Sequence, residues 1–578
     1  MGKSESQMDI MEKTTKPRKH RWTVVEIGLS IILLLMSCAL AGLVVLYASS
    51  LKGIATHSHS TAVSIAARLL QNMDPSVDPC QNFYQYACGG WLERHVIPET
   101  SSLHSVFNIL RDELEIVLKG ILETESERDR QAFKKAKMLY RSCMNESVIE
   151  QRDSQPLLKL IDSIGDWPVA SEDWNSTAEE TWRLDETLAT LNAHYNKKVL
   201  LEMFVWPDDR DSSRHIIHID QPSLGMPSRD YYLNDGNYKK VREAYLQFMV
   251  SMVKIAREDR NLTQDDEHVW DEVKQVMELE REIANATSPA EERNDITVLY
   301  NKMTLRELQD TFGLDGFNWT RYIQGIMESV SIVVNPEELI VVYCSPYLDK
   351  LNNILPRYDR RTVQNYLVWM LLMERVSSLS RRFKDVRAHY RKVSHYVYAC
   401  VFYLLNPLFF QVGELIRKIQ EAFVETVEEL NWMDDQSKEK AREKAMAISE
   451  QIGYPDYILQ EETQKLDQEY THSFGCMVGE GAGGMHCFWS PCRKQREGEE
   501  SYLPGLDLDH KQLFFLNFAQ VWCGACRPEY AIQSIKTDPH SPLEYRVLGS
   551  LQNFEAFSEA FHCQRGAPMN PEEKCRVW

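Results

Sequence analysis

Positive charge is scarce in this sequence of 578 residues, in which 65 Lys and Arg face 85 Asp and Glu. The resulting net charge of -20 argues against nucleic acid as a partner, because phosphate binding needs a basic face. The sequence also contains no internal repeat and no low-complexity tract, which argues against a repeat architecture. We therefore predict an acidic protein that does not bind nucleic acid.

Charged residues are absent from one stretch near the N-terminus. Ile27–Tyr47 gives 21 uncharged residues, which as a helix spans roughly the 30 Å of a bilayer core. A cleaved signal peptide, the alternative, would have a shorter apolar stretch followed by a small-residue cleavage site. We predict a cytoplasmic tail over residues 1–23, a transmembrane signal anchor over 24–48, a stalk over 49–78 and an extracellular remainder. The basic residues that favour this orientation are Lys3, Lys13, Lys16, Arg18, Lys19 and Arg21.

Two features beyond the anchor agree with an extracellular location. Twelve of the thirteen cysteines follow Cys38, as expected in an oxidising compartment. N-x-S/T sequons also occur only after the anchor, and each predicts a glycosylated surface loop. The five sequon residues are Asn145, Asn175, Asn261, Asn285 and Asn318.

The apolar pattern after the stalk is mainly helical, with stripes at spacings of three and four residues. We predict that these stripes pack in a core. They comprise Phe107, Leu110, Leu114, Val117, Leu118 and Ile121; Val269, Val273, Val276, Met277 and Ile283; and Ile416, Ile419, Phe423, Val427 and Leu430. The run Lys438–Glu450 is rich in strong helix formers.

Short β-type runs interrupt the helical pattern, and two segments differ from it altogether. The β-type runs are Val199–Val205, His215–Ile219 and Leu339–Tyr343. Tyr396–Phe410 is densely apolar and aromatic, while Thr471–Glu500 is rich in glycine and cysteine. We predict a mainly α fold with one large helical lobe over 79–456. Within this lobe, a segment over about 393–411 is expected to replace the sequence that would normally stand there. A divergent junction over 457–502 and a C-terminal part over 503–578 complete the chain.

Several long motifs resemble the neprilysin and endothelin-converting enzyme family of zinc metalloendopeptidases. The match covers most of the chain, apart from the two divergent segments. The motifs are Met1–Ile10, Cys80–Leu92, Val96–Thr100, His218–Pro222, Pro227–Tyr232, Met277–Thr287, Trp432–Asp456, Leu503–His510 through Cys523, Ser534–Arg546, and Phe561–Cys563 through Trp578.

The resemblance implies a type II membrane protein with a helical lobe and a thermolysin-like lobe that carries zinc. Members of such a family hydrolyse extracellular oligopeptides on the amino side of apolar residues, using zinc-activated water. An H-E-x-x-H helix supplies two zinc-binding histidines and the general base, and a Glu within E-N-x-x-D is the third ligand. This sequence contains neither motif: no histidine precedes a glutamate, and no two histidines are four residues apart.

The resemblance assigns roles to a few residues that remain. His540 matches the histidine that stabilises the oxyanion of the tetrahedral intermediate, and Arg546 matches the arginine that contacts substrate and orients that histidine. Arg111 matches a position near the substrate entrance. Leu103 falls where the family has an arginine that grips a substrate carboxylate. Without a metal beside it, His540 is also compatible with a purely structural role.

Disulfide pairs implied by the resemblance are Cys80 with Cys563, Cys88 with Cys523, and Cys476 with Cys575. Cys143 is expected to be free or to pair with Cys400. The pairing of Cys344, Cys487, Cys492 and Cys526 stays open.

Three other motifs admit alternative interpretations. Cys523–Cys526 has the C-x-x-C spacing of thiol-disulfide oxidoreductases, although an extra cysteine beside a structural disulfide is favoured. The glycines of Gly479–Gly484 are followed by no Lys-Ser/Thr, so a linker is favoured over a phosphate loop. His486 with its neighbouring cysteines matches no common zinc site. His215 and His218 should point to opposite faces of a strand.

We therefore predict a member of this family that binds no zinc and has no zinc-dependent peptidase activity. The alternative is a non-catalytic peptide-binding or folding-defective membrane glycoprotein, derived from an alternative transcript or an incomplete gene model. Expected partners are the lipid bilayer, through 24–48, and small extracellular peptides. The expected location is the plasma membrane, or the endoplasmic reticulum if the chain misfolds.

Overall fold

The computed structural model describes residues 63–99, 101–172, 174, 180–314, 316–394, 409–448, 458, 465–469, 503, 505–538 and 540–575. The chain divides into a smaller unit, residues 1–72 with 499–514, and a larger unit, residues 73–498 with 515–578. In the smaller unit a helix covers residues 63–72 and buries Ala66 and Leu69. None of the helices in the described ranges is long and apolar enough to span a bilayer. The predicted anchor over 24–48 lies outside those ranges.

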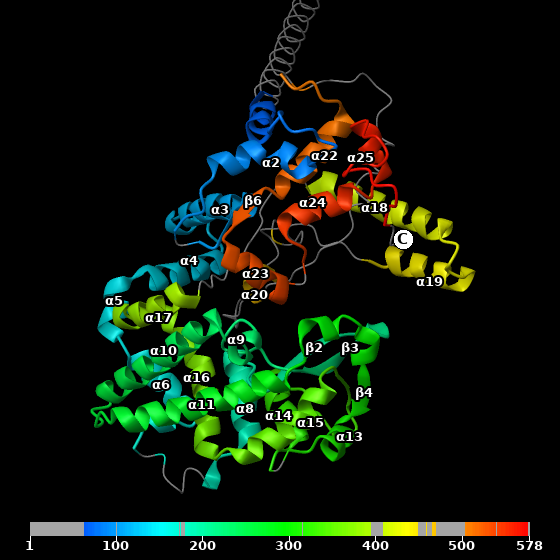
Figure 1. Ribbon diagram of the computed structural model, residues 1–578. Coiled ribbons are helices and arrows are strands. Elements are labelled where there is room, and N and C mark those ends of the chain that lie inside the picture. Colours follow the sequence, from blue (N-terminus) through cyan, green and yellow to red (C-terminus); the bar gives the residue numbers. More distant parts are fainter. Residues whose placement is uncertain are drawn as a thin grey trace, which may run out of the picture. The chain divides into compact units, whose positions relative to one another are not determined.

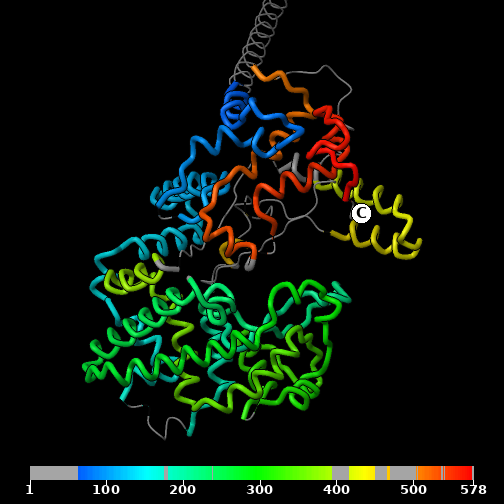
Figure 2. The backbone as a smooth tube through the Cα atoms, in the orientation of Figure 1, coloured from blue at the N-terminus to red at the C-terminus, as the bar shows by residue number. Residues whose placement is uncertain are grey.

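The larger unit contains a helical lobe whose centre is α16, Arg360–Arg375 (Figures 1 and 2). Every residue of α16 from Thr362 to Leu372 is buried, as expected for a helix that neighbours surround. Asp359 caps its N-terminus by accepting a hydrogen bond from the Thr362 backbone N–H. The neighbouring helices are α6 Gln155–Ser163, α8 Leu184–Tyr195, α10 Asn237–Asp259, α11 Asp266–Ala286, α14 Trp319–Met327, α15 Ser345–Ile354 and α17 Arg381–Ser394.

The predicted stripe on α11 is confirmed, since Val269, Val273, Val276 and Ile283 are all buried in the main core. Shorter elements complete the lobe. They are α5 Glu146–Arg152, α9 Asp230–Leu233, α12 Ile296–Leu299 and α13 Leu305–Thr311, with 3-10 turns at Pro168–Ala170, Ala290–Arg293, Glu328–Val330, Leu355–Arg357 and Val376–Ser378.

A four-stranded sheet covers one side of this core, with strand order β2-β3-β5-β4. The strands are β2 Glu202–Asp208, β3 Asp211–Asp220, β4 Asn301–Thr304 and β5 Leu339–Val342. β3 and β5 are parallel and the other two pairs are antiparallel. All three β-type runs expected from the sequence therefore contribute to one sheet.

The two histidines of β3 do lie on opposite faces of this sheet. His215 is exposed, whereas His218 is completely buried between the rings of Phe204 and Tyr343, each 5.2 Å away. The two rings that enclose His218 belong to a small second cluster with Ile216, and the ring nitrogens of His218 have no hydrogen-bond partner in the described structure. The pair therefore cannot bind one metal ion together.

The C-terminal segment packs on α2, Phe83–Arg94, which is more than 400 residues earlier in the sequence. Phe83 lies 4.7 Å from Phe557 and 4.9 Å from Phe561 between ring centroids, forming an aromatic core. The strand β1, Leu103–Ser105, pairs antiparallel with β6, Gly524–Cys526. The helices of this segment are α22 His510–Val521, α23 Pro528–Thr537, α24 Leu543–Leu551 and α25 Glu555–Ala560.

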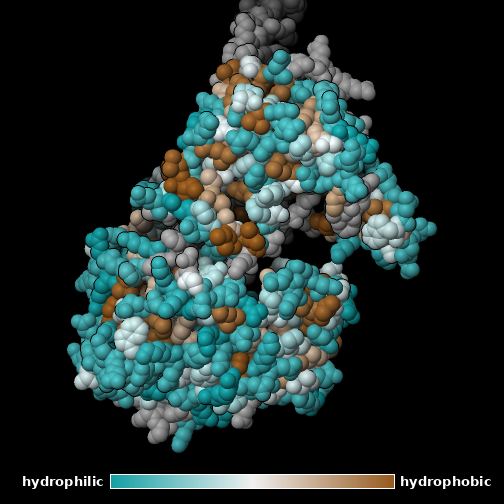
Figure 3. All heavy atoms as spheres, viewed as in Figure 1, coloured by the Kyte–Doolittle hydropathy of each residue, from teal (hydrophilic) through white to brown (hydrophobic). Residues whose placement is uncertain are grey.

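The core prediction is wrong for the stripe on α3, Val106–Glu123. None of the residues of α3 is buried, and Leu110, Val117 and Ile121 are 44%, 57% and 52% exposed. α3 packs beside β1 and α4, Gln131–Met144, which leave the rest of its apolar face at the surface (Figure 3). The periodicity identified an amphipathic helix correctly, but it could not reveal whether the chain supplies a partner.

The remaining described helices are α18 Phe409–Glu429, α19 Asp435–Met446 and α20 Lys465–Glu469. In the third predicted stripe, Val427 and Leu430 are buried. The helix expected over Lys438–Glu450 corresponds to α19, which begins three residues earlier and ends at Met446. Thr471–Glu500 and most of Tyr396–Phe410 lie outside the described residues.

Candidate functional site

His540 lies in an exposed turn between α23 and α24, where a neighbouring carboxylate holds it. Asp538 Oδ1 accepts a hydrogen bond from the His540 backbone N–H at 2.9 Å and lies 2.7 Å from His540 Nδ1. The His540 side chain remains 49% exposed. These contacts fix the local turn, and they use one of the two ring nitrogens.

Arg546, on the first turn of α24, stabilises the same turn. Its Nε donates to the Ser541 carbonyl at 2.7 Å, and its guanidinium lies over the Trp522 ring, 4.8 Å from the centroid. Arg546 thus contacts the residue after His540, and no described hydrogen bond joins it to the His540 ring. The resemblance implied that Arg546 contacts and orients the ring of His540. In this structure Arg546 instead donates a hydrogen bond to the backbone carbonyl of Ser541.

These residues do not fit a catalytic zinc ion. Such a site needs three protein ligands and leaves one position for water. His540 and Asp538 would supply two donors that already contact each other. No group of three or more His, Cys, Asp or Glu side chains suitable for a metal occurs among the residues placed by the structure.

Two further positions from the family comparison lie near the N-terminal part of α3. Arg111 forms ion pairs with Asp112 at 2.9 Å and Glu115 at 3.5 Å, so it is engaged along its own helix. Leu103 lies in β1 opposite Cys526 and offers no group that could bind a carboxylate. The structure thus provides no anion-binding side chain at Leu103.

Two of the expected disulfides are present, Cys80–Cys563 and Cys88–Cys523. They join α2 and the turn before it to the C-terminal segment, across sequence separations of 483 and 435. Cys476, the expected partner of Cys575, lies outside the described residues, as do Cys400, Cys487 and Cys492. Cys143 is exposed and free, and Cys344 is buried and free.

The C-x-x-C motif does not have the geometry of a redox site. Cys523 is bonded to Cys88, and Gly524–Cys526 is an extended strand. Three extended residues span about 10 Å, beyond the roughly 7 Å that a disulfide tolerates between Cα atoms. Burial also raises the pKa of the Cys526 thiol, whereas a redox nucleophile needs a lowered one. Cys526 is an extra cysteine beside a structural bond.

Four of the five sequon asparagines lie at accessible positions. Asn145, Asn261, Asn285 and Asn318 are exposed, while Asn175 lies outside the described residues. Asn145 and Asn318 also cap α5 and α14 through their side-chain oxygens. Glycosylation at these sites stays a prediction that the surface geometry permits.

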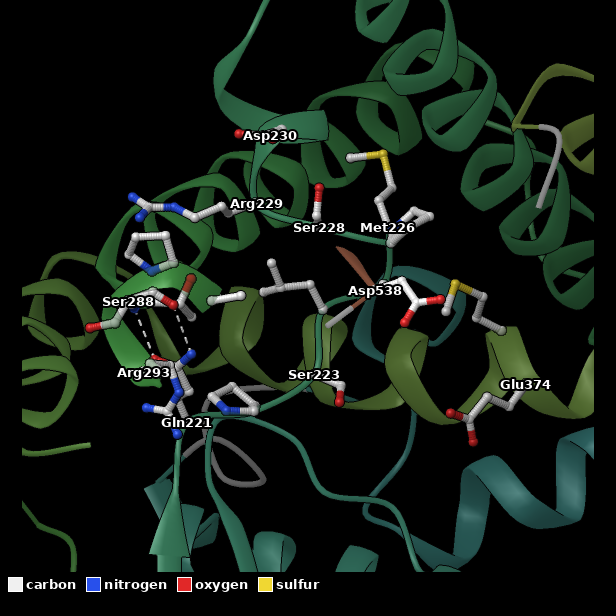
Figure 4. Close-up of a pocket in the computed structure, with 18 of the residues that line it drawn as sticks. Gln221, Ser223, Met226, Ser228, Arg229, Asp230, Ser288, Arg293, Glu374 and Asp538 are labelled. Atoms are coloured by element: carbon white, nitrogen blue, oxygen red, sulfur yellow. Dashed lines mark hydrogen bonds between the residues drawn. The ribbon is translucent and has the colours of Figure 1, made fainter. Parts of the chain in front are cut away.

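A cavity is lined mainly by the helical lobe, at a place that the sequence reasoning did not identify as a site. Its volume is about 1260 Å³, and three stretches of chain form most of its lining (Figure 4). These stretches are the loop Gln221–Asp230, the segment Thr287–Asn294, and the facing parts of α16 and α17. Lys197, Phe248, Ile535 and Asp538 complete the lining.

The loop Gln221–Asp230 is held rigidly against a buried carboxylate. Glu280 is completely buried, and its Oε1 accepts a hydrogen bond from the Gly225 backbone N–H at 2.8 Å. Tyr245 donates its hydroxyl to Glu280 Oε2 at 3.0 Å. Only glycine fits at 225, because a Cβ there would lie 2.0 Å from the Tyr245 hydroxyl. Burial raises the pKa of the Glu280 carboxyl.

A second contact fixes the opposite wall. Gln221 donates its side-chain N–H to the Ser288 carbonyl at 3.0 Å and accepts from the Ser288 backbone N–H at 2.9 Å (Figure 4). Arg293 binds both oxygens of Asp220, at 2.7 and 2.8 Å. The cavity walls are therefore formed by backbone that buried and partly buried side chains hold in place.

Two signals in the sequence could have pointed to this cavity. The loop carries Pro222, Gly225 and Pro227, which mark an irregular but stiff backbone. The helix that faces it, Arg381–Ser394, contains six Lys and Arg and one Asp, in a chain whose net charge is -20. Neither signal places the two stretches together, because they are about 150 residues apart.

Comparisons with family models and with known proteins all match this chain to one peptidase family. Two family models, both described as peptidase family M13, match residues 79–397 and residues 417–577. The chain is 41% identical to human membrane metallo-endopeptidase-like 1 and 39% identical to human neprilysin, and each alignment covers 100% of both proteins. The first alignment runs over 779 positions, 201 more than the 578 residues of this chain, so at least that many positions face a gap here.

Solved structures agree with this result at the level of the fold. A zinc metalloprotease from Mycobacterium tuberculosis superposes with a TM-score of 0.63 at 18% identity, over 88% of this chain and 99% of that one. PepO from Lactobacillus rhamnosis gives a TM-score of 0.62 at 16% identity, over 85% and 98%.

Proposed function

The chain belongs to peptidase family M13, and from that premise we propose that it is a neprilysin-like membrane glycoprotein that binds extracellular oligopeptides without hydrolysing them. The observation that carries this proposal is that neither H-E-x-x-H nor E-N-x-x-D occurs in the 578 residues. Zinc-activated hydrolysis requires the ligands and the general base that those motifs supply. Loss of all of them removes the metal and the activated water together.

The residues that remain support a structural role for the C-terminal segment. His540 is engaged by Asp538, and Arg546 by the Ser541 carbonyl and the Trp522 ring. An oxyanion-stabilising histidine contributes only when a nucleophile attacks the substrate carbonyl. With no activated water to attack, His540 and Arg546 serve to hold the turn between α23 and α24.

The proposal places residues 24–48 in the membrane and the chain beyond them outside the cell. The basic tail and the uncharged run support this orientation. The exposed sequon asparagines and the two long-range disulfides also suit an oxidising, glycosylating compartment. The human relatives that match over their full length are named as a membrane metallo-endopeptidase and as neprilysin.

The gap relative to the longer relatives is best explained as an internal loss. We place it between about Tyr470 and Leu503, where family-like sequence stops and resumes, with a second replacement near 393–411. The 201 surplus positions in the alignment with human membrane metallo-endopeptidase-like 1 support an internal loss. Sequencing the transcript across codons 390 to 505 tests this: an uninterrupted reading frame through H-E-x-x-H would replace the proposal with an active peptidase.

A hydrolysis assay tests the central proposal. The full-length chain, purified in detergent, is incubated with a quenched fluorogenic peptide that contains an internal apolar residue, with and without a chelator. Human neprilysin, prepared in the same way, is the positive control. We expect no chelator-sensitive cleavage by this chain. Cleavage that the chelator abolishes and added zinc restores would contradict the proposal.

A second candidate, a folding-defective glycoprotein, is favoured by the exposed apolar face of α3. Ile116 is 73% exposed and Val117 57% exposed, which is unusual for an amphipathic helix inside a lobe. Retention in the endoplasmic reticulum would leave its N-glycans sensitive to endoglycosidase H. Resistant glycans together with surface labelling would eliminate this candidate and leave the peptide-binding one.

A further inference from the structure

Two histidine rings lie against one buried tryptophan beside the strand β1. Trp91, on α2, is 2% exposed. His95 stacks on its ring with centroids 4.2 Å apart and planes 10° apart, and His104, in β1, lies 5.7 Å away at 27°. The centroids of the two histidines are 5.8 Å apart. Both histidines are partly buried, so a charge on one ring is only partly screened from the other.

The position of His95 accommodates a positive charge. His95 is the C-cap of α2, and its Nδ1 lies 2.8 Å from the Trp91 carbonyl oxygen. Because a carbonyl can only accept, this nitrogen carries a hydrogen, and the other ring nitrogen is the one that gains a proton in acid. The C-terminal end of a helix and the face of an indole ring both attract a cation. A single imidazolium therefore fits at His95.

The position of His104 disfavours a second positive charge. Burial lowers the pKa of the His104 imidazole, and the neighbouring His95 lowers it further. Asp112, on α3, acts in the opposite direction, but Arg111 binds its carboxylate at 2.9 Å. Protonation of both histidines would place two imidazolium rings side by side. The neutral ring is therefore the form of His104 that the closed packing favours.

The other charged or titratable groups around the pair belong to α2, α3, β6 and α24. They are Tyr84, Glu93, Arg94, Arg111, Asp112, Cys526, Arg527 and Glu544. Carboxylates and guanidinium groups keep their charge between about pH 5.5 and about pH 7.5. Burial raises the pKa of Tyr84 to about 12, and it raises the pKa of the Cys526 thiol from a value already above this range. Within this set, the two imidazoles are thus the groups whose charge changes between neutral and mildly acidic pH.

β1 joins the N-terminal part of the larger unit to its C-terminal segment. His104 lies opposite Ala525 in the short ladder between β1 and β6. Beyond this pair, the Val106 N–H donates to the Cys523 carbonyl at 3.0 Å. Each strand has only three residues, so displacing one of them disturbs the whole ladder.

We propose that His95 and His104 form an acid-sensitive latch, in which protonation of both rings displaces His104 from Trp91 and opens the β1–β6 ladder. A single proton, held by His95, leaves the ladder closed. The latch requires no ligand, so it is independent of the proposed peptide binding.

The direction of the pH effect follows from the linkage between protonation and folding. A histidine whose folded-state pKa is lowered stabilises the folded ladder above the unfolded value of about 6.5, and this contribution is lost as the pH falls through the lower folded-state pKa. The ladder is therefore closed at neutral pH and opens in mild acid, the range in which histidine clusters switch interfaces. At the proposed extracellular location the latch is closed, and it opens where the protein meets an acidified compartment.

Hydrogen exchange measured by mass spectrometry on the full-length chain in detergent tests the latch. Exchange is compared at about pH 7.4 and about pH 5.5, and each rate is divided by the intrinsic chemical rate at that pH. We expect the peptides that contain β1 and β6 to exchange about threefold or more faster, relative to the intrinsic rate, at the lower pH. The buried helix α16 is the internal reference and should not change.

Substitutions at the histidines assign the effect. His104→Phe keeps a ring against Trp91 but cannot be protonated, so it should exchange like the unmodified chain at neutral pH and lose the acid response. His95→Phe should reduce the response without removing it, because His104 is still buried. His215→Phe, at an exposed histidine of β3, is the matched control and should keep the full response.

Three results would overturn the latch: no acid response of β1 and β6 in the unmodified chain, an undiminished response in His104→Phe, or an equally large response in α16. Thermal melting at neutral pH verifies that each variant is folded. If His104→Phe does not fold, His104→Gln, which is polar and does not titrate, takes its place with the same expected and contradicting results.

Discussion

In the helical lobe, α16 is buried from Thr362 to Leu372, whereas α23 in the C-terminal segment leaves Ile532 60% and Ile535 71% exposed. The helices of the lobe find their packing partners among one another, since their buried residues form one core cluster. The C-terminal segment keeps a small core against α2, and two disulfides hold it there. The difference shows that α16 is surrounded by packing partners, whereas one apolar face of α23 has none to cover it among the described residues.

A substitution at the centre of the helical lobe should give the largest difference between the lobe and the C-terminal segment. Trp369 is completely buried and donates its indole N–H to the Tyr245 hydroxyl at 2.7 Å. Trp369→Ala should destabilise the lobe by about 3–5 kcal/mol, because it leaves a cavity and removes the N–H donor to the buried Tyr245 hydroxyl. Hydrogen exchange should accelerate in α10, α11 and α16 and stay unchanged in α2 and α25. Equal acceleration of hydrogen exchange in the helical lobe and in the C-terminal segment with α2 would show that the two regions unfold as one unit.

The converse experiment removes a bond from the C-terminal segment. Cys523→Ala breaks the bond to Cys88 and should cost about 2–4 kcal/mol in that segment. Amide exchange should increase in α2, β6 and α22, with the lobe unaffected. Cys143→Ala, at an exposed free thiol, is the control and should change neither region.

The sheet of the helical lobe gives a smaller, pH-dependent effect. Asp208 is buried, and hydrogen bonds from Lys302 at 2.6 Å and Tyr300 at 2.7 Å lower the pKa of its carboxyl. A lowered folded-state pKa stabilises the fold above the unfolded value of about 3.9 and loses this contribution as pH falls below it. Asp208→Asn should cost about 1.5–3 kcal/mol at pH 7.

Denaturant melts from pH 7 to pH 3 measure this effect. The difference between Asp208→Asn and the unmodified chain should shrink as the pH falls below about 4. Asp349→Asn, at an exposed carboxylate, serves as the control. A difference that stays constant with pH would show that the charge of Asp208 is not the stabilising element.

The smallest effect is expected on α3. Ile116→Lys, at a side chain that is 73% exposed, should change the stability by no more than about 0.5 kcal/mol and should reduce aggregation. Val273→Lys, at a buried position of α11, is the contrasting variant and should prevent stable folding. A loss above about 2 kcal/mol for Ile116→Lys would mean that α3 has a packed partner after all.

The fold was predictable from the sequence where the pattern depended on local chemistry. The stripe on α11, the strand runs of the sheet and the opposite orientations of His215 and His218 all follow from helical and strand periodicity. Periodicity failed on α3, because it reports that a helix has two faces and not whether a neighbour exists to cover one.

Functional sites were likewise predictable only where their residues are close together in the sequence. The missing zinc ligands could be read directly, since the motifs are contiguous in sequence. The cavity could not be predicted, because Gly225 and Arg387 line one cavity only in the folded lobe, where Glu280 binds the loop and Tyr245 binds Glu280. The contact of Arg546 with the Ser541 carbonyl likewise depends on how α24 turns, which motif matching does not specify.

Zinc content of the full-length chain is the most direct test of the account. The protein is purified in detergent, dialysed against metal-free buffer after equilibration with micromolar zinc, and analysed by mass spectrometry, with human neprilysin as the reference. We predict far less than one zinc per chain for this protein, against about one for the reference. One tightly held zinc per chain, retained through dialysis, would contradict the account.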